Sequence, residues 1–385
     1  MRLFSNQYGH LVHRKVLSTT LGVVLCVSWN MAGAYDWSSD YGVSLTLGIE
    51  DNYRLTTEDE TDTTSAEAGV FTSITGADET TRLQFTLGAR EKRFSESSID
   101  DQTTYNMGFN GSKSAERLLG RLSVSYRQES TTETELLDSG DNRDGERKTT
   151  AISPGVDYQL DERNTLSADY SFQDVSYDTV SLTEYTNNSL SLGWSHQLDE
   201  TTRVSTGFTH TVYDPDDDDS TDVDSVNLGY GFQTSAATNY NLTVGLSNID
   251  RPEGSETSGT GAFNVTHQTD DRNSFTLALS KDYEGSGDGE VRETDRVNLL
   301  WNHALSETTQ TTVFAEGANN SADDDANNDD RTYYTVGAGA NYNYTREINL
   351  SADYRFRIRD ENNNAADADN AKSNSLFFTV SYSPL

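Results

Sequence analysis

Hydrophobic and polar residues alternate over most of this chain, in segments separated by polar clusters. In Tyr41–Ile49 every second residue is apolar, and the residues between them are Gly, Ser or Thr. Successive side chains of a β-strand point to opposite faces, so this pattern predicts a strand with one apolar and one small, polar face. We count about eighteen such segments of roughly 9–13 residues, the length of a tilted membrane-crossing strand. We find no segment of helical period after residue 34, so the sequence predicts an all-β fold.

The connections between these segments alternate between short turns and long acidic loops. This order is expected of a transmembrane barrel, whose turns face the periplasm and whose loops face the exterior. The sequence Leu-Ser-Ala-Asp-Tyr occurs at 166–170 and 350–354, each time after a short turn, so we expect both copies to begin upward strands with Leu, Ala and Tyr toward lipid. The short turns are 75–81, 110–116, 160–164, 198–202, 234–239, 269–273, 305–309 and 345–349, and the long loops are 56–64, 131–147, 213–222, 284–293, 319–330 and 360–371.

Residues 35–385 are therefore predicted to form a closed antiparallel barrel of about 18 strands. The alternative is 16 strands, because a weak segment such as Val313–Ala315 is easily miscounted. A barrel of this size leaves an aqueous lumen unless a loop plugs it.

The first 34 residues differ from the rest and read as a signal peptide. Basic residues precede an apolar run at Leu21–Val27, and Ala32-Gly33-Ala34 supplies the small residues of a cleavage site, so we expect cleavage after Ala34. The run is too short for a membrane-spanning helix. The only cysteine, Cys26, lies in this segment, so the exported chain contains no disulfide.

Composition alone would favour disorder, since 63 acidic and 28 basic residues give a net charge of -35 with 33% hydrophobic residues. The 20 Tyr and 14 Phe argue against disorder, because they recur at alternate positions within the segments. So acidic a chain does not bind nucleic acid by charge.

Enzyme and cofactor motifs are lacking in the sequence, so we expect neither catalysis nor a cofactor. Asp214, Asp216 and Asp218 match the first, third and fifth positions of a calcium loop. However, Asp219 stands where that loop needs Gly, and Ser225 where it needs Glu. The segment is predicted to be a solvated loop that attracts divalent ions only weakly, and no metal site is predicted.

The polar faces of the strands carry charge, which implies water inside the barrel. In the strand 350–358 and the residue after it, three arginines share the face opposite Leu350, Ala352 and Tyr354. We predict that these and other inward arginines either brace the wall against lumenal acids or set solute preference. The candidates are Arg355, Arg357, Arg359, Arg121, Arg127 and Arg82.

Aromatic residues are predicted to form a girdle at the membrane interface. The near repeats Leu192–Leu198 and Leu299–Leu305 place Trp and His on the apolar face at the ends of downward strands. Such pairs face lipid and have no carboxylate partner in view, so they are not expected to bind metal or catalyse. The girdle candidates are Trp194, Trp301, Tyr344 and Tyr382.

The last hairpin, 349–385, combines a Tyr-Arg-x-Arg-x-Arg strand, an Asp- and Asn-rich loop and a closing aromatic strand. In these features the chain resembles the outer-membrane β-barrel porins associated with exopolysaccharide gene clusters in Gram-negative bacteria. The resemblance implies an outer-membrane channel that passes or helps export polysaccharide, with export proteins as partners. The chain departs from common barrels by ending in Pro384-Leu385, with Tyr382 as its last in-register aromatic residue.

The sequence therefore predicts a porin-like channel for a hydrophilic solute, most simply a saccharide. Its expected partners are outer-membrane lipid, lipopolysaccharide and the barrel-assembly machinery. Two other classes stay open: a non-conducting scaffold or adhesin that displays acidic loops, and an outer-membrane hydrolase. The scaffold would have a plugged lumen, and the hydrolase would need a Ser-His or Asp-His pair at the outer rim.

Overall fold

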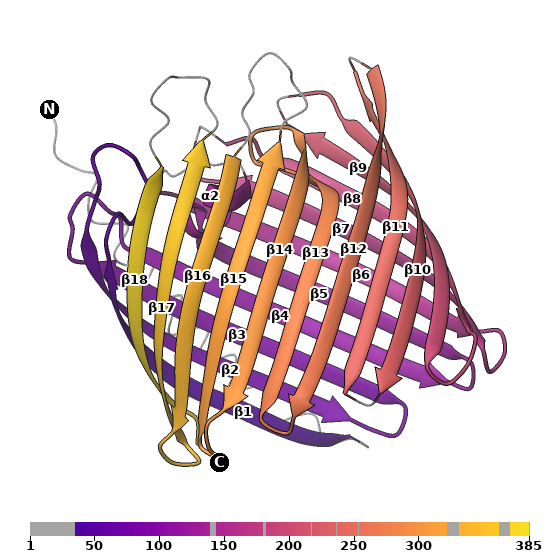
Figure 1. Ribbon diagram of the computed structural model, residues 1–385, viewed down its shortest axis with the longest axis horizontal. Coiled ribbons are helices and arrows are strands. Elements are labelled where there is room, and N and C mark those ends of the chain that lie inside the picture. The colour runs from indigo at the N-terminus through magenta and orange to yellow at the C-terminus, as the bar shows by residue number, and fades with distance from the viewer. Residues whose placement is uncertain are drawn as a thin grey trace, which may run out of the picture.

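The chain forms a barrel of eighteen antiparallel strands in this computed structural model (Figure 1). The structure describes residues 35–384 apart from 139–143, 180–181, 217, 236, 253, 322–330 and 362–369. The expected signal peptide, with Cys26, and most of the predicted loops 319–330 and 360–371 lie outside the described residues. The strands are β1 (Asp36–Glu50), β2 (Thr63–Ala77), β3 (Thr81–Phe94), β4 (Gln102–Ala115), β5 (Leu118–Ser130), β6 (Glu146–Gln159), β7 (Asn164–Tyr177), β8 (Tyr185–Gln197), β9 (Thr202–Pro215), β10 (Thr221–Ser235), β11 (Thr238–Arg251), β12 (Gly254–Asp270), β13 (Asn273–Gly285), β14 (Val291–Ala304), β15 (Thr309–Ser321), β16 (Arg331–Asn343), β17 (Ile348–Glu361) and β18 (Ala371–Tyr382).

Each strand pairs with its neighbours in sequence, and β1 closes the sheet by pairing with β18. This closing pair runs in continuous register from Val43 opposite Tyr382 to Glu50 opposite Ser375. The prediction of an all-β barrel of 18 strands is confirmed, and the weak segment Val313–Ala315 lies within β15. Closure leaves no sheet edge unpaired, so the backbone is satisfied without solvent.

The outer surface of the barrel carries the apolar face of each strand. On β1, Tyr41, Val43, Leu45, Leu47 and Ile49 are all about half exposed, at 49–58%. Exposed large hydrophobic residues recur around the barrel on every strand except β3 and β12, which is the arrangement needed for contact with lipid. Large apolar side chains facing outward in such numbers would be unfavourable in water.

Both copies of Leu-Ser-Ala-Asp-Tyr lie as predicted. They begin β7 and β17, which both follow short turns. Leu166, Tyr170 and Tyr354 are each exposed on the outer surface, and the intervening Asp169 and Asp353 therefore point inward. The repeat thus marks two strands that leave the same end of the barrel in the same orientation.

One end of the barrel carries the eight short turns that the sequence predicts. Aspartate side chains stabilise several of these turns, because the carboxylate accepts hydrogen bonds from backbone N–H groups further along the turn. Asp78 accepts bonds from the N–H groups of Thr80 and Thr81, at 2.7 and 2.6 Å. Asp199 accepts one from Thr201 at 2.8 Å. These bonds lower the pKa of both carboxyls.

The opposite end carries the remaining connections, of which three were not predicted: 95–101, 178–184 and the one between β11 and β12. It also holds a short helix, α2 (Thr131–Asp138), so the prediction of no helix after residue 34 was wrong. Eight residues make about two helical turns, which is too short for a periodic pattern to stand out in the sequence. Among the described residues, no helix is long and apolar enough to cross a membrane.

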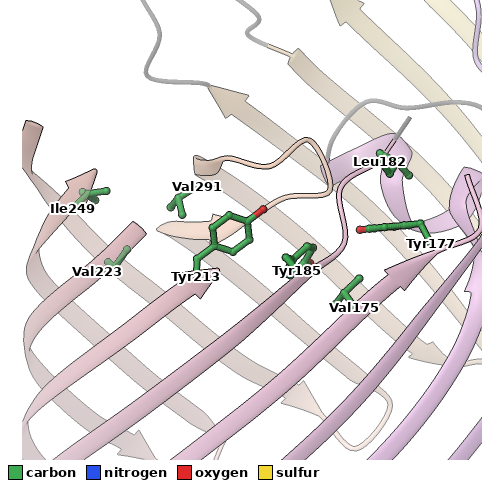
Figure 2. Packing of buried hydrophobic residues seen from close by; sticks show 8 residues of the cluster. All are labelled: Val175, Tyr177, Leu182, Tyr185, Tyr213, Val223, Ile249 and Val291. Atoms are coloured by element: carbon green, nitrogen blue, oxygen red, sulfur yellow. The ribbon is translucent and has the colours of Figure 1, made fainter. Parts of the chain in front are cut away.

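Buried apolar residues gather at the loop end rather than along the barrel axis. One cluster contains inward side chains of strands β7 to β11 together with Leu182 of the β7–β8 connection and Val291, the first residue of β14 (Figure 2). A smaller cluster joins Leu55 of the β1–β2 connection to Tyr333 and Ala371. The loops are thus packed onto the barrel mouth by hydrophobic contacts. The first cluster consists of Val175, Tyr177, Leu182, Tyr185, Tyr213, Val223, Ile249 and Val291.

Candidate functional site

The β1–β2 connection, 51–62, folds inward across one side of the mouth. Leu55 is almost fully buried and adopts a left-handed backbone with φ 52°, a conformation that is uncommon for a residue with this side chain. Tyr53 lies 3.1 Å from Thr132 of α2 through their hydroxyl oxygens, and Gln102 Nε2 donates to Tyr53 at 2.8 Å. Burial raises the pKa of Tyr53, so this hydroxyl stays protonated.

Helix α2 lies inside the mouth, where it contacts β5 and β6 on one side and β15 on the other (Figure 1). Its Glu135 is fully buried and accepts bonds from Arg147 at 2.9 Å and Tyr177 at 3.0 Å. Glu133, on the same helix, lies 3.6 Å from Lys92 of β3. A buried charge is tolerated only with such partners, so these contacts fix the helix against the wall.

The β13–β14 tip, 286–290, covers another part of the mouth. The hydroxyl of Tyr213 donates to the carbonyl of Ser286 at 2.6 Å, and the N–H of Thr183 donates to the carbonyl of Gly287 at 2.8 Å. A Cβ at Gly285 would collide with the Tyr213 ring, so the tip depends on glycine for its close approach. Three inward-folded segments, 51–62, α2 and 286–290, therefore narrow the entrance.

Beneath these segments lies a lumenal cavity of about 570 Å³, lined by α2 and by the inner faces of β1 to β3 and β15 to β18. We call it the upper chamber. Both signs of charge line it: Arg90, Lys92, Arg355 and Arg357 are basic, and Glu50, Glu67, Glu133, Glu316 and Asp353 are acidic. Phe314 and Phe377 add two aromatic rings to the same wall.

The basic residues of the upper chamber fall into two groups. Lys92 lies 3.3 Å from Glu50, and Arg90 lies 3.9 Å from Glu67, so both are paired with the wall. Arg355 and Arg357 form no ion pair with any described residue. The Arg355 guanidinium instead lies over the ring of Phe377, 5.8 Å from its centroid. Arg355 is exposed to the chamber, whereas Arg357 is half-buried and donates to Ser373 Oγ at 3.4 Å.

A second group of inward residues lies nearer the short-turn end. Arg121 of β5 bonds to Asp157 at 3.1 Å and to Asp169 at 2.9 Å, so this arginine braces three adjacent strands. Arg82 shares with Arg121 a cavity of about 330 Å³. A neighbouring cavity of about 600 Å³ is lined by Arg121, Asp157 and Arg203 together with many Ser and Thr side chains. The lumenal wall is thus polar below the upper chamber.

The structure separates the six predicted lumenal arginines. Arg355 and Arg357 line the upper chamber, whereas Arg82 and Arg121 lie in the lower cavities. Arg127 has the same orientation on β5 but lines none of these cavities, and Arg359 is buried near the top of β17. The sequence analysis missed Lys92, Glu50 and Glu133, because their grouping depends on where α2 lies.

The four aromatic residues predicted for the girdle all lie at the short-turn end. Trp194 and Trp301 are partly exposed on the outer surface near the ends of β8 and β14, and Tyr382 ends β18. Tyr344 lies in the β16–β17 turn. Each Trp neighbours a histidine whose Nδ1 is hydrogen-bonded to the asparagine that opens the preceding strand: His196 to Asn164 at 2.9 Å and His303 to Asn273 at 2.7 Å.

The predicted weak cation loop lies at the opposite end. Asp214 lies within β9, and Asp216 and Asp218 follow in the connection to β10. Among the described residues, no group of three or more His, Cys, Asp or Glu is arranged to hold a metal ion.

Comparisons with known proteins find similarity in structure only. No protein-family model matches the sequence, and no curated protein sequence matches it. The outer membrane protein opdK from Pseudomonas aeruginosa superposes with a TM-score of 0.52 at 12% identity, covering 91% of this chain and 98% of that one. Pseudomonas aeruginosa OccK2 (OpdF), solved in complex with glucuronate, gives 0.52 at 9% identity, with 90% and 99% covered.

The barrel has the fold of outer-membrane porins. A third structure, Acinetobacter baumannii OccAB4, agrees with a TM-score of 0.50 at 10% identity, covering 90% of this chain and 98% of that one. Together with the apolar exterior, this architecture places the protein in the outer membrane of a Gram-negative bacterium.

Proposed function

We propose that the protein is a porin-like channel that passes a hydrophilic solute, a saccharide, across the outer membrane. The observation that carries this proposal is the upper chamber: a polar, charged cavity in the lumen, at the level where α2 narrows it. A charged lumen in a membrane barrel requires water, and fixed charges at a constriction act on whatever passes.

Two features support a saccharide as the solute. The chamber is lined by cationic hydrogen-bond donors and by carboxylate acceptors. Such a lining suits a solute rich in hydroxyl groups, because each hydroxyl both donates and accepts hydrogen bonds. One neighbour of the same fold, OccK2, was solved with the sugar acid glucuronate. The resemblance of the last hairpin to barrels associated with exopolysaccharide clusters further motivates a link to polysaccharide export.

Planar-bilayer recording tests the proposal directly. The mature chain, refolded in detergent and inserted into a bilayer, is expected to give stable single-channel current that added oligosaccharide reduces. A barrel that inserts but carries no current would contradict the channel and favour a scaffold that displays acidic loops.

The inward-folded segments at the mouth also lead us to expect a limit on solute size. The inward-folded segments 51–62, α2 and 286–290 reduce the entrance, so the channel is expected to be selective in solute size rather than a wide general pore. Recording with polyethylene glycols of increasing mass would measure this limit, and a cut-off as large as that of an unobstructed 18-strand barrel would contradict it.

A further inference from the structure

Three phenylalanines point inward and pack over glycines of the barrel wall. They are Phe71 of β2, Phe314 of β15 and Phe377 of β18, each with the opposite parity to the lipid-facing residues of its strand. Val70, next to Phe71, and Phe378, next to Phe377, are both exposed on the outer surface.

Each of these rings lies over an inward glycine of the neighbouring strand. A Cβ at Gly42 would come within 2.6 Å of Phe71, and one at Gly48 within 2.9 Å of Phe377. A Cβ at Gly337 would collide with Phe314. All three glycines are buried, so one side of each ring is used against the wall. Phe314 and Phe377 stay partly exposed and line the upper chamber, where Arg355 and Lys92 lie over the Phe377 ring, 5.8 and 5.9 Å from its centroid.

Phe314 and Phe377 lie on either side of a strip of wall within the upper chamber. Three strand spacings separate β15 from β18, or about 14 Å. Gly337 of β16 lies between them, opposite Phe314 on one side and Arg355 on the other. Asp353, the next inward residue, is opposite Phe377. The strip therefore offers two aromatic faces with a cation and a carboxylate between them.

Phe71 extends the same arrangement toward the short-turn end. Gly48 is opposite Phe377 and Gly42 is opposite Phe71, so the two rings flank β1 six residues apart. That separation is about 20 Å along the strand. A solute leaving the upper chamber toward the periplasm would thus meet a further ring on the same wall.

We propose that this wall is a carbohydrate-binding path, in which Phe314 and Phe377 stack against sugar rings while Arg355 and Asp353 bond their hydroxyls. The proposal rests on the channel function above and names the residues that select its solute. The C–H groups on one face of a pyranose are attracted to the negative face of an aromatic ring. Its hydroxyls need donors and acceptors at the edge, which the charged pair supplies. Passage of ions alone does not require aromatic rings packed over glycines, whereas stacking of sugar rings does require an aromatic surface.

The test uses the full-length mature barrel and current block by maltohexaose. Phe314→Leu and Phe377→Leu keep apolar bulk but remove the ring, so each is expected to raise the dissociation constant for block about two- to tenfold. Phe378→Leu is the matched control, because it removes the adjacent ring from the lipid side. Block by a polyethylene glycol of similar size should be equal in all variants.

The outcomes separate this proposal from the channel function. Equal saccharide block in the wild type and both lumenal variants would overturn the path while leaving the channel intact, and a conducting wild type that no saccharide blocks would overturn it as well. If the barrel carries no current, calorimetric titration of the detergent-purified protein with maltohexaose replaces block. Weaker binding in Phe377→Leu than in Phe378→Leu would then support the path without a channel, and equal binding would overturn both.

Discussion

The guanidinium of Arg355 lies 5.8 Å from the ring centroid of Phe377, on the inner wall of the barrel. The two residues come from adjacent strands, β17 and β18, and both line the upper chamber. The arginine makes no ion pair with the described part of the chain, so its charge acts on the lumen rather than on the wall. This contrasts with Arg121, whose charge is taken up by Asp157 and Asp169.

Removing charge from Arg355 and Arg357 together should shift the channel toward cations. A charge about 4 Å from a passing ion contributes about 1 kcal/mol in water, so each substitution by Gln should change the anion-to-cation permeability ratio roughly fivefold. The reversal potential in a salt gradient measures this ratio. Arg346→Gln, which removes the same charge from the β16–β17 turn, should leave it unchanged. A conducting double variant with the wild-type reversal potential would refute the assignment.

Loss of the Glu135 charge should release α2 from the wall. Glu135→Gln removes the buried carboxylate charge that Arg147 faces, and breaking a buried ion pair from one side typically costs about 3–5 kcal/mol. We therefore expect larger and noisier single-channel currents, because the helix no longer holds one position in the mouth. Glu135→Gln combined with Arg147→Met removes both charges and should be less disruptive to stability. Wild-type current in Glu135→Gln would mean that the helix does not limit the pathway.

Gly285→Ala should loosen the cover formed by the β13–β14 tip. The added methyl collides with the Tyr213 ring, and overpacking of this kind costs about 1–3 kcal/mol. A lower urea midpoint for unfolding in detergent is the expected result. Gly259→Ala is the control, since a Cβ there meets nothing within 4 Å. If both variants unfold at the same midpoint, the tip does not pack as described.

The turn aspartates predict how acid affects stability. Backbone N–H bonds lower the pKa of Asp78 and Asp199 in the folded state, so the unfolded state takes up these protons first. Their contribution is complete above the ordinary aspartate pKa of about 3.9 and is lost as the pH falls through the folded value. Asp199→Asn should therefore weaken the decline of stability in acid. Glu200→Gln, in the same turn, should change this profile less, as chemical denaturation at several pH values would reveal.

Much of the barrel could be predicted because its pattern is local. Alternation along β17 separates Tyr354 from Arg355 without knowledge of any other strand, since side chains of a strand alternate between faces. The short turns were equally readable, because residues such as Asp199 satisfy the backbone within the turn itself. The eighteen strands and their orientation follow from these two signals.

The mouth could not be predicted in this way. Thr131–Asp138 is too short to show helical periodicity, and its Glu135 is buried only because Arg147 and Tyr177 surround it in the closed barrel. The residues around Leu55 likewise do not indicate that its side chain folds inward. The residues that bury it, Tyr333 and Ala371, come from strands far away in the sequence.

The sequence alone determined that this protein is a lipid-facing barrel with a charged lumen, because strand faces and turns are set by residues that are near neighbours in the chain. Tertiary structure alone decided which of the inward charges are paired on the wall, and which rings pack over glycines of the neighbouring strand. Those properties depend on pairs such as Gly48 with Phe377, or Lys92 with Glu133, that closure of the sheet and folding of the loops bring together. Contacts between side chains on different strands depend on which strands are neighbours in the closed barrel, and the spacing of residues along the sequence does not reveal them.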